Sequence, residues 1–100
     1  PTVSSRKPVR QWPCEIPIDG QPADVHKIVS DYHNWLRETE TPKLLFHAEP
    51  GAIIKASDAK WIQENFPNTT VVNIGKGLHY IQEDNPHMIG AELKKWYSKL

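Results

Sequence analysis

The sequence has little of what marks several specialised classes of protein. Its 100 residues include a single cysteine, Cys14, so no disulfide forms within the chain, as in proteins of reducing compartments. Twelve basic residues balance twelve acidic ones, so no charge excess indicates a nucleic acid or a membrane as partner. No apolar run approaches the roughly 20 residues needed to cross a bilayer. We expect a cytoplasmic protein, with the periplasm as the alternative.

Proline, by contrast, is concentrated at the start of the chain, at Pro1, Pro8, Pro13, Pro17 and Pro22. Each proline fixes φ and removes a hydrogen-bond donor, so we expect residues 1–22 to form an extended connector rather than a helix. After Pro22, apolar residues recur at helical spacing as far as Leu36. This pattern predicts an amphipathic helix that ends before Pro42.

The rest of the chain alternates predicted strands and helices. Residues 43–47 and 69–74 are mostly apolar or β-branched and are followed by glycine or proline turns, which is typical of strands. Between them we expect a helix with Ser57 as its N-cap, and after them a last helix that begins at Asn85 and Pro86. A strand, a crossover helix and a second strand form a parallel unit.

Two short strands offer too little surface for three apolar helix faces. Parallel sheets are covered on both faces and contain more than two strands. We therefore expect the sheet to be completed by polypeptide outside this sequence. The chain begins with Pro1 rather than methionine, and we expect its natural N-terminus to be lost or to lie on another polypeptide.

His79 is the leading candidate for a catalytic group. It lies in Gly77-Leu78-His79-Tyr80, on a short loop after the second predicted strand. A histidine on a tight loop beyond a buried parallel strand is where an α/β-hydrolase places its general base, which follows the nucleophile and the acid in chain order. No nucleophile is recognisable in this sequence, so the pattern indicates the final part of an enzyme.

Three segments together resemble the haloalkane dehalogenases. They are Trp12-Pro13, residues 47–52 (HAEPGA) and residues 77–86 (GLHYIQEDNP), and the segment 41–46 (TPKLLF) fits the same family. The resemblance extends over essentially the whole chain and corresponds to the last third of such an enzyme. It implies the C-terminal part of an α/β-hydrolase fold, with its last two parallel strands and their flanking helices, which needs the N-terminal portion to complete the sheet.

The resemblance also implies a division of the chain and a reaction. Residues 1–18 would be the return segment from a helical cap, and residues 19–100 would be the C-terminal part of the core domain. The implied reaction is hydrolytic cleavage of carbon–halogen bonds in haloalkanes to alcohol and halide. An aspartate displaces halide to form an alkyl-enzyme ester, and water activated by His79 hydrolyses that ester.

The resemblance implies no metal or organic cofactor, and the substrate would be a small haloalkane. Pro13 would line the halide site. The residues that would line the apolar pocket or its access tunnel are Ile16, Ala52, Ile53, Leu78 and Tyr80. The aspartate and the halide-binding tryptophan and asparagine are upstream in this family, so we expect this chain alone to be inactive and to need the N-terminal portion as a second chain.

Several alternatives stay open at this point. Glu49 follows the first predicted strand, where many α/β-hydrolases carry the acid of the triad, but the Pro-Gly-Ala after it matches enzymes whose acid is an upstream glutamate. We favour a structural role for Glu49. Trp12 is either a halide donor or, as we favour, a core residue. His26, His33, His47 and His87 lack the spacing of metal ligands, and we expect them to be scattered on the surface.

The same framework also serves epoxide hydrolases, ester hydrolases and a coelenterazine luciferase, which differ from dehalogenases upstream of this segment. A different class of function is an inactive fragment or one half of a split protein, whose role is to dock on a partner. Its exposed apolar faces would then be the interface.

Overall fold

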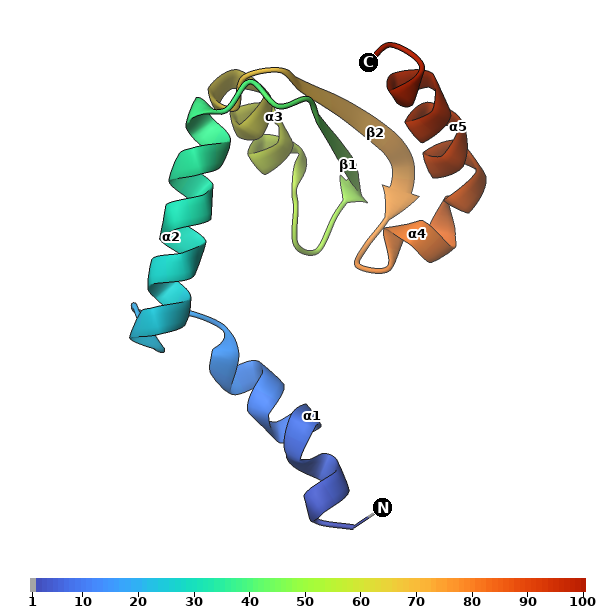
Figure 1. Cartoon of the computed structure of the whole chain (residues 1–100). Helices are drawn as coiled ribbons and strands as arrows, with labels where there is room; N and C mark the ends of the chain where they lie inside the picture. Colours follow the sequence, from blue (N-terminus) through green and yellow to red (C-terminus); the bar gives the residue numbers. More distant parts are fainter. Residues whose placement is uncertain (1) are drawn as a thin grey trace. The chain divides into compact units, whose positions relative to one another are not determined.

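The computed structural model describes residues 2–100 (Figure 1). Contacts divide the chain into two units, one that extends to Leu36 and one from Arg37 to Leu100. The elements of the first unit are η1 (Ser4–Arg6), α1 (Lys7–Gln11), η2 (Trp12–Glu15) and α2 (Ala23–Glu38), which continues past the boundary. The elements of the second unit are β1 (Lys43–Pro50), α3 (Ala56–Asn65), β2 (Thr69–Gly77), α4 (Ile81–Asp84) and α5 (Pro86–Tyr97).

The expected extended connector is wrong over residues 4–15, where η1, α1 and η2 are consecutive short helical turns. Residues 16–22 are not helical, as expected, and Pro1 lies outside the described residues. The prolines do not prevent the helical turns. Pro8 and Pro13 are the second residues of α1 and η2 and so lie in their first turns. A backbone N–H has no intrahelical partner there, and the fixed φ of proline already suits a helix. The predicted helix after Pro22 is confirmed as α2, which ends before Pro42.

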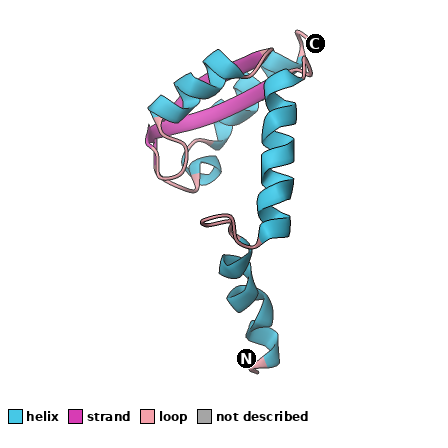
Figure 2. Ribbon diagram, turned by 90° about the vertical axis from the view of Figure 1, so that its left-hand side faces the viewer, coloured by secondary structure: helices cyan, strands magenta, loops and turns pink. Residues whose placement is uncertain are grey.

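The sheet of the second unit has two strands in the described part of the chain, and they are parallel as predicted. Figure 2 shows β1 and β2 side by side. Lys43 pairs with Thr69, and the register continues until His47 pairs with Asn73, after which it shifts. Both strands continue beyond their predicted ends, β1 to Pro50 and β2 to Gly77. This extra length brings the two following loops together.

The helices of this unit pack against the sheet, since α3 and α5 each contact both strands. The predicted N-cap at Ser57 is wrong, because α3 begins at Ala56 with Lys55 as its N-cap. The Asp58 carboxylate, in the first turn of α3, accepts a hydrogen bond of 2.9 Å from the Lys55 backbone N–H. This side chain therefore caps the start of the helix. The last helix begins at Pro86 as predicted, and the short helix α4 before it was not predicted.

The buried core is small. Its buried apolar residues are Ala48, Ala59 and Ile74. Larger apolar side chains on the helices remain open to solvent; Trp61 on α3 is 43% exposed and Leu93 on α5 is 46% exposed. None of the helices within residues 2–100 is long and apolar enough to cross a membrane. The second unit has the parallel strands and flanking helices of an α/β fold, but the apolar faces of its helices are only partly covered.

Candidate active site

His79 lies on the loop that links β2 to α4, and the turn after β1 holds this loop in place. The Gly51 backbone N–H donates a 3.1 Å hydrogen bond to the Gly77 carbonyl oxygen, and the Ala52 N–H donates one of 2.8 Å to the Leu78 carbonyl oxygen. These bonds continue the parallel pairing of β1 and β2 beyond the strands themselves. The backbone immediately before His79 is therefore fixed by a second segment of chain.

The other end of the loop is held by the helices that follow it. The Tyr80 carbonyl oxygen accepts a 2.9 Å hydrogen bond from the Glu83 backbone N–H. The Asn85 side-chain Nδ2 donates one of 2.9 Å to the Lys76 carbonyl oxygen. A side chain at Gly77 would come within 3.0 Å of the Ala48 Cβ atom, so the loop begins in a space that only glycine fits easily. His79 thus stands on a short segment bound at both ends.

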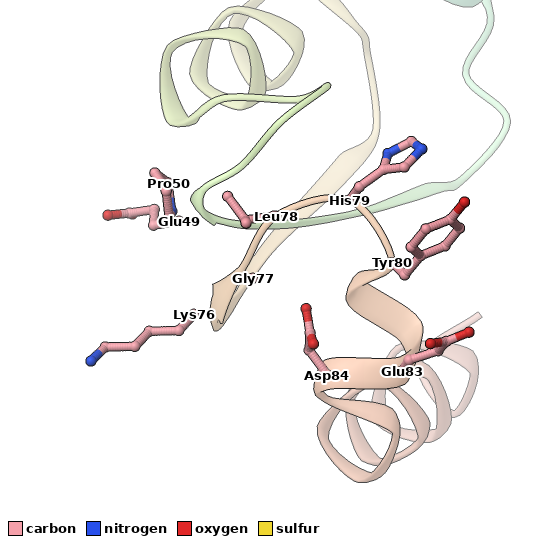
Figure 3. A pocket seen from close by; sticks show the side chains of 9 residues that line it. All are labelled: Glu49, Pro50, Lys76, Gly77, Leu78, His79, Tyr80, Glu83 and Asp84. Carbon is pink, nitrogen blue, oxygen red and sulfur yellow. The ribbon is translucent and has the colours of Figure 1, made fainter.

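The His79 loop forms one wall of an open groove of about 880 Å³, whose lining side chains Figure 3 shows. The lining residues are Glu49, Pro50, Lys76, Gly77, Leu78, His79, Tyr80, Glu83 and Asp84. The His79 imidazole and the Tyr80 ring lie 4.8 Å apart between centroids and are tilted by 55°. The exposed His79 imidazole is the type of group that serves as a general base, and it lies beside the apolar side chains of Leu78 and Tyr80.

The curated proteins that match this sequence include several haloalkane dehalogenases. No family model matches the chain. A haloalkane dehalogenase of Mesorhizobium japonicum is 45% identical over 96 residues, which cover 96% of this chain and 31% of the relative. A haloalkane dehalogenase of Sphingobium indicum is 42% identical over 96 residues, which cover 32% of that relative. The chain is homologous to the haloalkane dehalogenases. It spans about a third of the length of the curated relatives it matches.

Solved structures that match this chain are haloalkane dehalogenases as well. The crystal structure of a putative ancestral haloalkane dehalogenase, AncHLD2, superposes with a TM-score of 0.92 at 39% sequence identity, and the match covers 99% of this chain and 34% of that one. The predicted fold class is therefore confirmed: the chain has the fold of part of an α/β-hydrolase, with two parallel strands and flanking helices. The resemblance to haloalkane dehalogenases seen in the sequence is confirmed as well.

The residues predicted for the dehalogenase pocket fall into both units of the chain. Ala52, Ile53, Leu78 and Tyr80 lie in the same unit as His79. The Ala52 backbone N–H donates a hydrogen bond to the Leu78 carbonyl oxygen, and Leu78 and Tyr80 line the groove. Pro13 and Ile16 lie in the first unit. The pocket roles of these residues, the catalytic role of His79 and the division of the chain at residue 18 remain predictions.

Glu49, the alternative triad acid, is held by a neighbouring strand. Its Oε1 atom accepts a 2.7 Å hydrogen bond from Asn73 Nδ2, and Asn73 Oδ1 in turn accepts one of 2.8 Å from the Gly75 backbone N–H. Figure 3 shows the Glu49 carboxylate and the His79 imidazole pointing in different directions. This geometry favours the structural role. Asn73 was not singled out in the sequence, because it comes near Glu49 only through the pairing of β1 with β2, in which its own partner is His47.

Two expectations about other aromatic and imidazole side chains are corrected. Trp12 is 76% exposed and does not pack in a core, and His47 is not on the surface, since only 8% of it is exposed. The signal for His47 was present, because it lies in the apolar run of β1 between Phe46 and Ala48, and strands of a parallel sheet are buried on both faces. Within residues 2–100 no group of three or more metal-ligating side chains occurs.

Proposed function

We propose that this chain supplies the catalytic base and part of the substrate pocket of a haloalkane dehalogenase. The observation that carries the proposal is the placement of His79, on a loop bound at both ends and open to a groove at the carboxyl end of the sheet. Ligands of α/β proteins bind at this edge. The homology to haloalkane dehalogenases supports the same reading.

In the proposed reaction, the nucleophile is an aspartate of the N-terminal portion, outside this chain. Its carboxylate oxygen attacks the carbon that bears the halogen, so that a carbon–oxygen bond forms as the carbon–halogen bond breaks and halide leaves. A water oxygen then attacks the ester carbonyl carbon while the His79 imidazole takes the proton of that water. Breakage of the ester releases the alcohol, regenerates the carboxylate, and leaves His79 to pass its proton to solvent.

The neighbours of His79 suit this task. Leu78 and Tyr80, the residues before and after His79, line the groove with it, and their apolar surface suits an uncharged haloalkane. The resemblance to haloalkane dehalogenases assigns Ala52 and Ile53, on the turn after β1, to the same pocket, and likewise Pro13 and Ile16 of the first unit. We propose no metal or organic cofactor, because both bond-breaking steps need only a carboxylate and a base.

The proposed partner of the chain is the N-terminal portion of the same enzyme. Apolar side chains on α3 and α5 are exposed by nearly half of their surface, and the matched relatives have about two further thirds of chain. Burial of such faces is the main favourable contribution to folding and association. The N-terminal portion would also contribute the aspartate and the halide donors, so the present chain would be inactive by itself.

The test uses a hybrid enzyme, in which the N-terminal portion of the Mesorhizobium japonicum relative, up to its matched segment, is joined to this chain. We expect the hybrid enzyme to release bromide from 1-bromobutane and the variant His79→Phe to stop sustained release. His87→Phe is the matched control, because His87 is an exposed histidine on α5 outside the groove. Absence of bromide release from a folded hybrid enzyme would overturn the proposal. Epoxide opening, ester hydrolysis or light from coelenterazine would then identify the alternative.

A further inference from the structure

A second, smaller cavity adjoins the His79 loop. It has a volume of about 100 Å³, and both His47 and His79 line it, together with Leu78 and otherwise mainly apolar residues. A water molecule takes up about 30 Å³ in the liquid, so the cavity has room for one to a few waters. It therefore lies between a buried histidine of β1 and the loop that carries the proposed base.

The His47 side chain needs a hydrogen-bond partner that residues 2–100 do not provide. It is 8% exposed, and its buried Nδ1 atom has no hydrogen-bond partner among the described residues. Nearly all buried polar atoms in folded proteins are paired with protein or with ordered water. A leucine would fill this position in β1 without leaving such an atom, so packing alone does not account for a histidine here.

Two residues that line the cavity also bring backbone carbonyl groups close to the Gly51 turn. Ala48 and Ile54 line the cavity, and their carbonyl oxygens converge on Gly51, at 2.8 and 2.5 Å from the position of a Cβ atom built there. Carbonyl oxygens accept hydrogen bonds from water, whereas Nδ1 accepts or donates one according to the tautomer of the ring. Water in a protein interior usually makes two to four such bonds.

We propose that a water molecule in this cavity binds His47 Nδ1 and supports the loop that carries His79, which makes His47 a positioning residue for the base. This inference rests on the proposed role of His79. The path from the cavity to His79 is short, because the Gly51 backbone N–H donates a hydrogen bond to Gly77 at the start of the same loop. Loss of the water would loosen the turn and the loop together and would displace the imidazole from the ester that it must serve.

The first test compares His47→Leu with His47→Asn in the hybrid enzyme. The asparagine amide is attached to Cβ through one carbon, as Nδ1 is in histidine, so it can bond the same water, whereas leucine has a similar shape and no polar atom. We expect His47→Leu to lower kcat for bromide release about tenfold with little change in KM, because a misplacement of 1 Å can cost about 100-fold and a smaller one costs less. We expect His47→Asn to restore kcat to within about twofold of the unsubstituted enzyme. Equal kcat values for the two variants would overturn the proposal.

The second test does not depend on activity or on the folding of a variant. A crystal structure of the unsubstituted hybrid enzyme is expected to show an ordered water within hydrogen-bond distance of His47 Nδ1. An empty cavity, or a group of the N-terminal portion bonded directly to Nδ1, would overturn the inference. If the hybrid enzyme releases no bromide, the proposed function fails, and the crystal structure still decides whether the water site exists.

Discussion

The backbone N–H of Ala52 donates a hydrogen bond of 2.8 Å to the carbonyl oxygen of Leu78. This bond joins the turn after β1 to the loop after β2, one residue before His79. It carries the parallel pairing of the strands into the two loops at the carboxyl edge of the sheet, where α/β proteins place their ligands. The position of the proposed base therefore depends on residues that take no part in the chemistry.

The first prediction concerns Gly51, which precedes Ala52 in this turn. Its φ is +66°, and a Cβ atom there would lie 2.5 Å from the Ile54 carbonyl oxygen. Gly51→Ala should therefore lower the free energy of unfolding of the hybrid enzyme through both backbone strain and steric overlap, by about 2–5 kcal/mol. It should lower bromide release as well, because the turn holds the His79 loop. Denaturant unfolding and initial rates measure the two effects.

Gly75→Ala is the matched control for this prediction. Gly75 also has a positive φ, +92°, but nothing lies within 4 Å of a Cβ atom built there. Its substitution should cost only the backbone strain, about 1–2 kcal/mol. Equal losses of stability for the two variants would show that the overlap at Gly51 is relieved by movement of the turn.

The elements that could be predicted from the sequence are those with a clear period. The apolar spacing after Pro22 predicted α2, and the β-branched run after Thr69 predicted β2. The segment with Pro8 and Pro13 was misread because proline both interrupts a helix and begins one. Proline begins a helix when it lies in the first turn and interrupts one when it lies further along. The sequence has no apolar period here that would show where a first turn begins.

The site was predictable only in part, for a related reason. His79 could be singled out because it follows a predicted strand and a glycine on a short loop. The hydrogen bond between Glu49 and Asn73 could not be predicted, because it depends on how the two strands pair. The burial of His47 and the exposure of Trp12 also differed from expectation. Burial depends on what covers a residue, and the two strands within residues 2–100 leave the apolar helix faces only partly covered.

A second prediction separates the two steps of the proposed reaction. In the hybrid enzyme, His79→Phe removes the base for ester hydrolysis and leaves the displacement of halide by the aspartate intact. The variant should therefore release about one equivalent of bromide from 1-bromobutane and stop, with a butyl group attached to the protein. Mass spectrometry of the intact protein detects that group. Continued turnover, or a complete absence of bromide and butyl group, would contradict the role given to His79.

A third prediction decides the identity of the triad acid. Glu49→Gln keeps an oxygen that accepts the hydrogen bond from Asn73 Nδ2, so a structural Glu49 tolerates the change, with kcat within a few-fold of the unsubstituted hybrid enzyme. Replacement of the acid of a catalytic triad by its amide lowers kcat about 10⁴-fold. A loss approaching that size, with unfolding unchanged, would make Glu49 the partner of His79. Glu49→Ala, which removes the bond to Asn73, should lower stability more than Glu49→Gln does.

A fourth prediction concerns the chain without the N-terminal portion. Trp61 and Leu93 are nearly half exposed on α3 and α5, and apolar surfaces of this kind associate in water. We expect the isolated chain to self-associate, as measured by analytical ultracentrifugation, and to show no bromide release. Co-production with the N-terminal portion of the Mesorhizobium japonicum relative should give a one-to-one complex that releases bromide, because the same faces are then covered. A monodisperse monomer with one cooperative unfolding transition would contradict the need for a partner, since two strands and a small core would then suffice for a stable fold.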